Sequence, residues 1–184
     1  MCFSSHTPND IAAEQWYLNT VMAEQGWDYS LGSANVLIAI VDNAIAIDHQ
    51  DLAGNIYTNS AEANGLPFFD DDLNGFVDDV NGYDLSNNDA NPRPPTGASG
   101  NNDGFTHGTH VAGLASAKTN NGIGMASLGY NCKILPVKVA ADNSDGSSFN
   151  KGVDGIFYAM RTGADIINMS WGTTSDVAVL HTII

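Results

Sequence analysis

His107 stands where a loop turns into a predicted helix of very small residues, a position that suits a catalytic base. Histidine is the one side chain whose unperturbed pKa lets it take up and release protons near neutral pH. Such a base needs a carboxylate behind the ring and a weak nucleophile in front of it. Asp42 is the candidate carboxylate because it closes the apolar run 36–41. That run predicts a buried parallel strand, and catalytic groups gather at the carboxyl ends of such strands.

Three motifs occur in an order that is typical of one protease family. Residues 40–42 read Ile-Val-Asp and precede Asp-His-Gln-Asp-Leu, residues 107–113 read His-Gly-Thr-His-Val-Ala-Gly, and residues 167–172 read Ile-Asn-Met-Ser-Trp-Gly. Together they resemble the subtilisin-like serine proteases, from about Gln15 to Gly172. The resemblance implies a serine endopeptidase that cleaves peptide or protein substrates through an acyl-enzyme. Asp42 would then orient the imidazole, and His107 would act as base and then as acid.

The family nucleophile is a serine in a Gly-Thr-Ser-Met-Ala turn, which does not occur in this sequence. Residues 172–175 read Gly-Thr-Thr-Ser, but Ser175 follows the proposed substrate strand directly, which leaves no chain to carry it back to His107. We therefore expect the sequence to be the N-terminal part of a longer catalytic domain, with the serine beyond Ile184. This chain alone is then expected to be inactive.

The resemblance also implies which residues hold the substrate. Residues 145–148 predict an exposed loop, and in the family such a loop lends its backbone to an extended peptide. Gly146 and Ser147 occupy that position here. The other side of the cleft would come from Ser170, Trp171 and Gly172, with the indole of Trp171 shaping an apolar pocket.

An acidic loop at residues 70–81 has oxygen-bearing side chains at alternate positions, followed by a glycine, as in loops that wrap Ca²⁺. No glutamate closes the loop at its twelfth position, where Asn81 stands, so the similarity to an EF-hand is in ligand order only. The alternative is a solvated acidic loop that binds nothing. The predicted ligands are Asp70, Asp72, Asn74, the Phe76 carbonyl, Asp78 and Asp79.

A second calcium loop is implied by the resemblance alone. In the family an amide oxygen and backbone carbonyls meet an aspartate that matches Asp51. The corresponding residues here are Asn121, Ile123 and Met125. The loop is one residue longer than in the best-known members, so Asn120 is an alternative to Asn121.

The elements that must position these residues fit one domain of 184 residues. Further strands are predicted at 133–139 and 165–169, and helices at 107–118 and 152–162. Residues 1–31 form an N-terminal arm with a short helix that caps the sheet, and residues 32–184 form an incomplete core. The expected fold is a parallel α/β sheet with helices on both faces, subtilisin-like and truncated at the C-terminal side.

Asn43 and Ala44 depart from the family pattern, which has Thr or Ser and then Gly after the aspartate. Ala44 brings a Cβ to a tight turn, so its φ must stay negative. We expect the Asn43 side chain to donate a hydrogen bond to a carboxylate, as the family hydroxyl does.

The composition excludes several kinds of partner. Six basic against 21 acidic residues give a formal net charge of −15, which argues against nucleic acid. No apolar run approaches the roughly 18 residues of a membrane span, and no signal peptide is visible at the start. The resemblance implies an extracellular, secreted protein. The redox state of Cys2 and Cys132 and the oligomeric state stay open.

Two rival functions are considered. A metal hydrolase could use His107 and His110, but the usual zinc motif spaces its histidines by four residues and carries a glutamate base, which is absent here. A calcium-stabilised, non-catalytic binding module on the same fold is favoured by Asn43, Ala44 and the missing serine. The presence of both Asp42 and His107 argues for the protease, because a scaffold needs neither.

Overall fold

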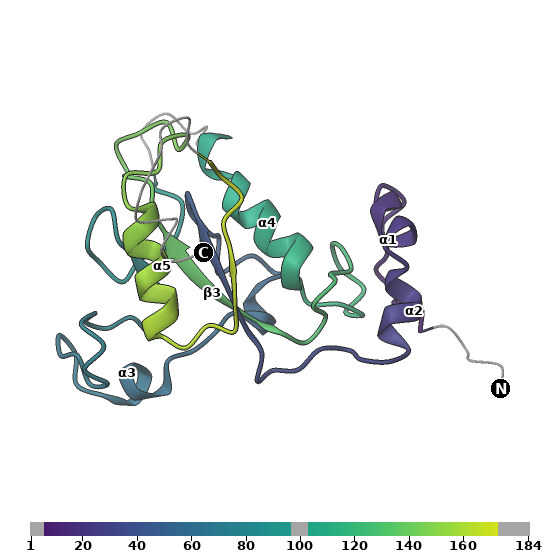
Figure 1. Cartoon of the computed structure of the whole chain (residues 1–184), viewed down its shortest axis with the longest axis horizontal. Helices are drawn as coiled ribbons and strands as arrows, with labels where there is room; N and C mark the ends of the chain where they lie inside the picture. The colour runs from purple at the N-terminus through teal and green to yellow at the C-terminus, as the bar shows by residue number, and fades with distance from the viewer. Residues whose placement is uncertain (1–5, 97–102, 173–184) are drawn as a thin grey trace.

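A four-stranded parallel sheet forms the centre of the molecule, in a computed structural model that describes residues 6–96 and 103–172 (Figure 1). The strand order is β2-β3-β1-β4. The strands are β1 Leu37–Asp42, β2 Tyr83–Asp84, β3 Lys133–Lys138 and β4 Ile166–Asn168. The helices are α1 Trp16–Thr20, α2 Ala23–Trp27, α3 Ser60–Asn64, α4 His107–Ser116 and α5 Gly152–Arg161, with 3₁₀ turns η1 Ala53–Asn55 and η2 Asp103–Phe105.

The sheet is covered by a helix on each face, as the sequence predicts. All six residues of β1 are buried, which suits a strand with apolar neighbours on both sides. Its successive side chains face opposite helices. Ile40 packs in the same cluster as Ala112 of α4, whereas Val41 packs with Tyr158 of α5. Figure 1 shows α4 and α5 on opposite sides of the strands, and the predicted α/β class is confirmed.

The N-terminal arm differs from the expectation of one helix that caps the sheet. It forms two short helices, α1 and α2, which lie to one side of the sheet (Figure 1). Leu18 and Trp27 pack against Ala126 and Tyr130 in the turn before β3. Because α4 and α5 already occupy both faces of the sheet, the arm buries Leu18 and Trp27 on this turn instead.

Strand β2 was not expected from the sequence. It has only two residues, inside a segment rich in Asn and Asp, and pairs with the end of β3. Such a short strand gives no periodic signal, because two residues cannot establish an alternation. No helix in the described part of the chain is long and apolar enough to cross a membrane.

Helix α4 approaches β1 very closely at its first turn. A Cβ on Gly108 would lie 2.4 Å from the Ala44 carbonyl oxygen and 2.9 Å from the Asp42 Cβ. Only glycine leaves space for this approach, so Gly108 lets the neighbouring His107 come within reach of β1. The helix ends at Ser116, two residues before the predicted limit at Lys118.

Replacing Gly108 by alanine is therefore expected to destabilise the chain by about 1–3 kcal/mol, the usual cost of overpacking a tight site. Gly26→Ala is the matched control, because Gly26 is an exposed residue of α2 and its added Cβ meets no atom within 4 Å. The control should be neutral, or stabilising by up to about 1 kcal/mol. Urea unfolding measures both, and equal stability of the two variants would contradict the close approach.

Candidate active site

Asp42 and His107 lie in direct contact at the carboxyl end of β1. The Nδ1 atom of His107 is 2.9 Å from Oδ1 and 3.0 Å from Oδ2 of Asp42. The Asp42 side chain is fully buried, whereas 49% of the His107 side chain is exposed. The ring therefore stands between a buried carboxylate and the solvent, although 65 residues separate the two in sequence.

This contact fixes the proton arrangement of the ring. An ionised carboxylate only accepts hydrogen bonds, so Nδ1 carries a proton and donates it. In the neutral ring, Nε2 then keeps its lone pair. With Nδ1 held by Asp42, the lone pair of Nε2 can take a proton from a hydroxyl group, and Nε2 can later return it.

The Asn43 side chain does not bind the Asp42 carboxylate, contrary to the sequence-based expectation. The backbone N–H of Asn43 makes that bond instead, 2.7 Å from Asp42 Oδ1. The amide side chain turns to the backbone of two neighbouring loops, with its nitrogen 2.6 Å from the Gly104 carbonyl oxygen. Ala44 is not among the positive-φ residues, as predicted.

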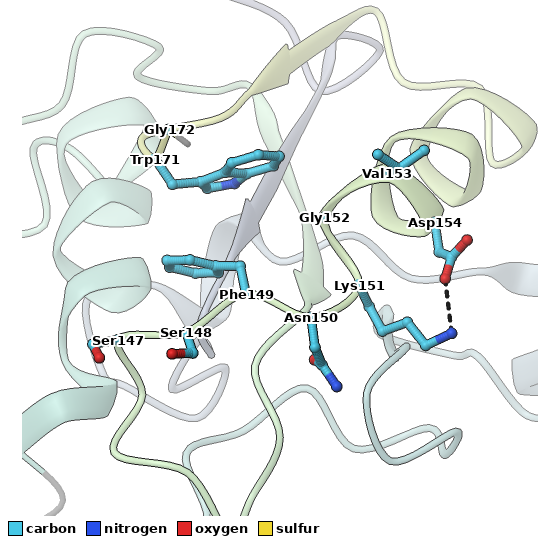
Figure 2. A pocket seen from close by; sticks show the side chains of 10 residues that line it. All are labelled: Ser147, Ser148, Phe149, Asn150, Lys151, Gly152, Val153, Asp154, Trp171 and Gly172. Atoms are coloured by element: carbon cyan, nitrogen blue, oxygen red, sulfur yellow. Dashed lines mark hydrogen bonds and ion pairs between the residues drawn. The ribbon is translucent and has the colours of Figure 1, made fainter. Parts of the chain in front are cut away.

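Trp171 lines one side of a pocket of about 470 Å³ near the same edge of the sheet (Figure 2). Its indole stacks on Phe149 with ring centroids 5.9 Å apart and planes at 20°. Its Nε1–H donates to the Val41 carbonyl oxygen at 2.7 Å. Residues 147–154 and 171–172 line the pocket. Phe149 was not identified from the sequence, because it carries no motif and only packing places it opposite Trp171.

The predicted substrate residues do not all lie in this pocket. Ser147, Trp171 and Gly172 line it, whereas Gly146 and Ser170 are outside its lining. The Gly146 carbonyl accepts from Asn43 at 3.2 Å, which places this loop beside the Asp42–His107 pair. The Ser170 hydroxyl donates to Asn168 at 2.9 Å. Ser175 lies outside the described residues.

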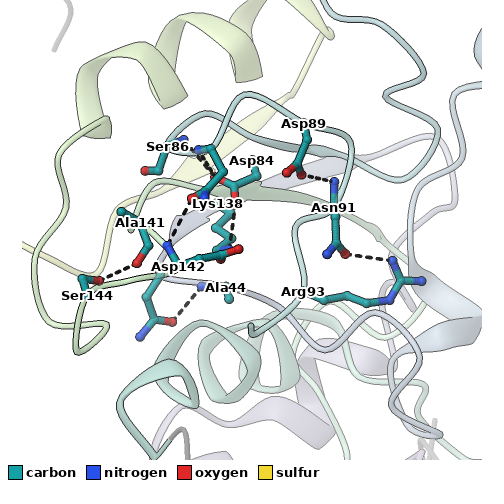
Figure 3. Close-up of polar contacts among 12 residues, drawn as sticks. Ala44, Asp84, Ser86, Asp89, Asn91, Arg93, Lys138, Ala141, Asp142 and Ser144 are labelled. Atoms are coloured by element: carbon teal, nitrogen blue, oxygen red, sulfur yellow. Dashed lines mark hydrogen bonds and ion pairs between the residues drawn. The ribbon is translucent and has the colours of Figure 1, made fainter. Parts of the chain in front are cut away.

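A buried ion pair lies at the ends of strands β2 and β3, beside the candidate site (Figure 3). Lys138 Nζ lies 2.7 Å from Asp84 Oδ2 and also contacts Asp142, and the side chains of Lys138 and Asp84 are each 1% exposed. Burial raises the pKa of Asp84, and Lys138 partly counters this. Lys138 is the register partner of Asp42, and its Nζ lies 5.7 Å from the centroid of the Phe105 ring. The pair fixes the strand ends on which the site is built.

The acidic loop brings three carboxylates together. Oxygen atoms of Glu62, Asp70 and Asp72 lie within 4.8 Å of one another, the one such group of potential ligands in the described part of the chain. Glu62 comes from α3 and was missed because it precedes the loop motif. Asp70 accepts from the backbone N–H groups of Asn74 and Gly75.

The other predicted ligands of this loop have different surroundings. Asp78 accepts from the Phe68 backbone N–H at 2.9 Å. Asp79 is fully buried and accepts from Tyr158, Asn59 and Asn74. Burial raises the pKa of Asp79, and these hydrogen bonds lower it in part. The Phe76 backbone N–H donates to the Asn74 side chain.

The second predicted loop converges on Asp51. Its Oδ1 accepts from the Asn121 side chain and its Oδ2 from the Met125 backbone N–H, both at 2.9 Å. Asp10 joins from the N-terminal arm, because its Oδ2 accepts from the Asn121 backbone N–H at 2.8 Å. The other oxygen of Asp10 is buried without a hydrogen-bond partner. A buried carboxylate oxygen without a donor suits a cation. Asp10 was not identified from the sequence, because it belongs to no motif.

A substitution of Trp171 tests its position in the pocket. Trp171→Phe keeps the ring beside Phe149 and removes the hydrogen bond to the buried Val41 carbonyl. We expect a loss of about 1–2 kcal/mol in the free energy of unfolding. Trp16→Phe is the control, since Trp16 is 70% exposed, and should change stability by less than about 0.5 kcal/mol. Equal effects in denaturant unfolding would contradict the described position of Trp171.

The comparisons with known proteins agree with this geometry. Residues 33–181 match the model of the subtilase family, peptidase S8. The chain is 34% identical to thermitase of Thermoactinomyces vulgaris, over 92% of this chain and 49% of thermitase. It is 34% identical to the halolysin-like extracellular serine protease Nep of Natrialba magadii, over 90% of this chain and 26% of Nep. A solved protease structure from Pseudoalteromonas arctica PAMC 21717 superimposes with a TM-score of 0.62 at 30% identity, covering 97% of this chain and 55% of that one. The chain thus spans about half, or less, of each relative.

Proposed function

This chain belongs to the subtilase family, and from that premise we propose that it carries the aspartate and histidine of a serine endopeptidase. The observation that supports this most is the contact of His107 Nδ1 with both oxygens of the fully buried Asp42. The half-exposed ring leaves Nε2 available to a substrate and a nucleophile. The proposed substrates are peptides or proteins, bound along Gly146 and Ser147 on one side and residues 170–172 on the other.

The proposed reaction passes through an acyl-enzyme. His107 Nε2 takes the proton of a serine hydroxyl while its oxygen attacks the peptide carbonyl, and Asp42 stabilises the charged ring. The ring then gives this proton to the leaving amine, and water releases the acyl group by the same steps. No hydrogen bond among the described residues joins His107 to a hydroxyl group. We propose that the nucleophile is a serine beyond Ile184, so this chain alone hydrolyses no peptide.

The non-catalytic module remains the second candidate, because Asn43 and Ala44 replace the family residues after the aspartate. In this structure, however, that turn still holds Asp42 against His107. Secretion is part of the proposal and is supported by relatives such as the extracellular protease Nep.

Peptide hydrolysis tests the proposed function. The product of the full coding sequence should cleave a peptide p-nitroanilide, whereas the 184-residue chain should not. In the active product, His107→Ala should lower kcat by about six orders of magnitude, the loss known when subtilisin, a member of this family, loses its own histidine. Asp42→Asn should lower it by about four orders, as in another serine-protease triad. Hydrolysis by the full product that survives His107→Ala would refute the assignment.

We also propose that Ca²⁺ binds at two places in this chain. The first is the acidic loop, where Glu62, Asp70 and Asp72 converge. The second is formed by Asp10, Asp51 and the loop at Asn121, Ile123 and Met125, where the unpartnered Asp10 oxygen is the supporting observation. Carboxylate, amide and carbonyl oxygens are the ligands that Ca²⁺ prefers. The bound ion would offset part of the net charge of −15.

Calcium is therefore expected to raise the melting temperature of the chain. At a free concentration one hundred times the dissociation constant, binding adds about 2.7 kcal/mol of stability. Glu62→Gln and Asp10→Asn should each lower the calcium-dependent shift, and Glu24→Gln, on α2, should not. Differential scanning fluorimetry with calcium and with excess chelator measures this. An unchanged melting temperature would exclude calcium binding at both places.

A further inference from the structure

Asn43 lies at the junction of three segments that form the candidate site. Asn43 is 1% exposed and belongs to the turn that follows Asp42. We propose that Asn43 is a positioning residue, which ties the substrate loop at Gly146 to the first turn of α4, next to His107. This inference rests on the peptide hydrolysis proposed above and adds a residue to that machinery.

The nitrogen of the Asn43 side chain holds two loops. Nδ2 donates to the Gly104 carbonyl at 2.6 Å and to the Gly146 carbonyl at 3.2 Å. These two glycines also touch each other, because a Cβ on Gly146 would lie 2.5 Å from the Gly104 oxygen. The loop before α4 and the proposed substrate loop therefore meet through bare backbone, and the amide of Asn43 closes their junction.

The oxygen of the same amide holds the start of α4. Oδ1 accepts from the Gly108 backbone N–H at 3.0 Å and from the Ala44 backbone N–H at 2.8 Å. The first N–H groups of a helix have no partner within the helix. The N-cap residue of α4, Thr106, makes no side-chain cap hydrogen bond. Asn43 thus caps this helix from the turn after β1, and the Gly108 N–H that it binds is one residue from His107.

Asparagine suits this position because its amide has two N–H donors and an oxygen with two lone pairs, and all four are used here. Aspartate has the acceptors but no donor. Serine and threonine have one hydroxyl on a shorter arm, which cannot reach four backbone groups. Because one planar group makes all four contacts, a shift of the substrate loop is transmitted to the turn that carries His107.

Amide hydrogen exchange of the whole chain tests this link. Asn43→Ser removes all four contacts, and we expect exchange about tenfold faster both at Gly108 and in residues 144–147. Asn43→Asp keeps the oxygen acceptors and removes both donors, so only residues 144–147 should exchange faster. If Asn43→Ser does not fold, Asn43→Asp still tests the contacts of the two donors, and unchanged exchange of residues 144–147 in that variant would overturn the positioning role.

Asn55→Ser is the matched control. Asn55 is 2% exposed and donates to the carbonyl oxygens of Ser116 and Tyr130, at the other end of α4. Its loss should lower global stability without a selective effect at Gly108 or residues 144–147. If Asn43→Ser changes exchange no more than Asn55→Ser does, or frees only one of the two segments, the positioning role is overturned.

Kinetics of a form of the protein that hydrolyses peptides give the second measurement. Asn43→Ser should lower kcat/KM about tenfold more for a peptide with four residues before the scissile bond than for a short ester that does not reach Gly146. Asn55→Ser should leave this ratio unchanged, and an unchanged ratio in Asn43→Ser overturns the role in substrate positioning. If no form hydrolyses peptides, the proposed function fails, and hydrogen exchange still decides whether Asn43 links loop and helix.

Discussion

The contact between the His107 ring and the buried Asp42 carboxylate places a strong constraint on this structure. A carboxylate without solvent is costly unless hydrogen bonds satisfy it. Asp42 receives them from the His107 ring and from the Asn43 backbone N–H. Strand β1 must therefore end at Asp42, and α4 must begin beside it. The same contact leaves half of the ring in solvent, which is what a proton-transferring group needs.

The close approach of these segments depends on small residues. Gly108 lets α4 lie close to the turn that follows β1. Gly104 and Gly146 let two loops contact each other through their backbones. Where side chains are this small, backbone groups come near enough to be satisfied by one amide, that of Asn43. The departure from the family pattern after Asp42 thus leaves the pair in place and brings its own set of hydrogen bonds.

The acidic residues of the chain are not spread evenly. Glu62 of α3 lies close to Asp70 and Asp72 of the acidic loop, and Asp10 lies beside the loop that contacts Asp51. Like charges at such distances repel, and a bound cation would remove that repulsion. Asp84 differs from these residues in having a basic partner, because the buried Lys138 lies against its carboxylate at the end of β3.

The sequence by itself determined the parallel sheet. Apolar runs such as 36–41 need burial on both faces of the strand, which a sheet between two covering helices provides. It also determined the pairing of Asp42 with His107 through the motifs that carry them. Only the tertiary structure decided the partners of Asn43, the entry of Glu62 and Asp10 into the acidic sites, and the two-residue strand β2. Local sequence patterns indicate which side chains of a helix or strand are buried. They carry no information on which distant backbone groups will lie within 3 Å of a side chain, because packing of the whole chain sets those distances.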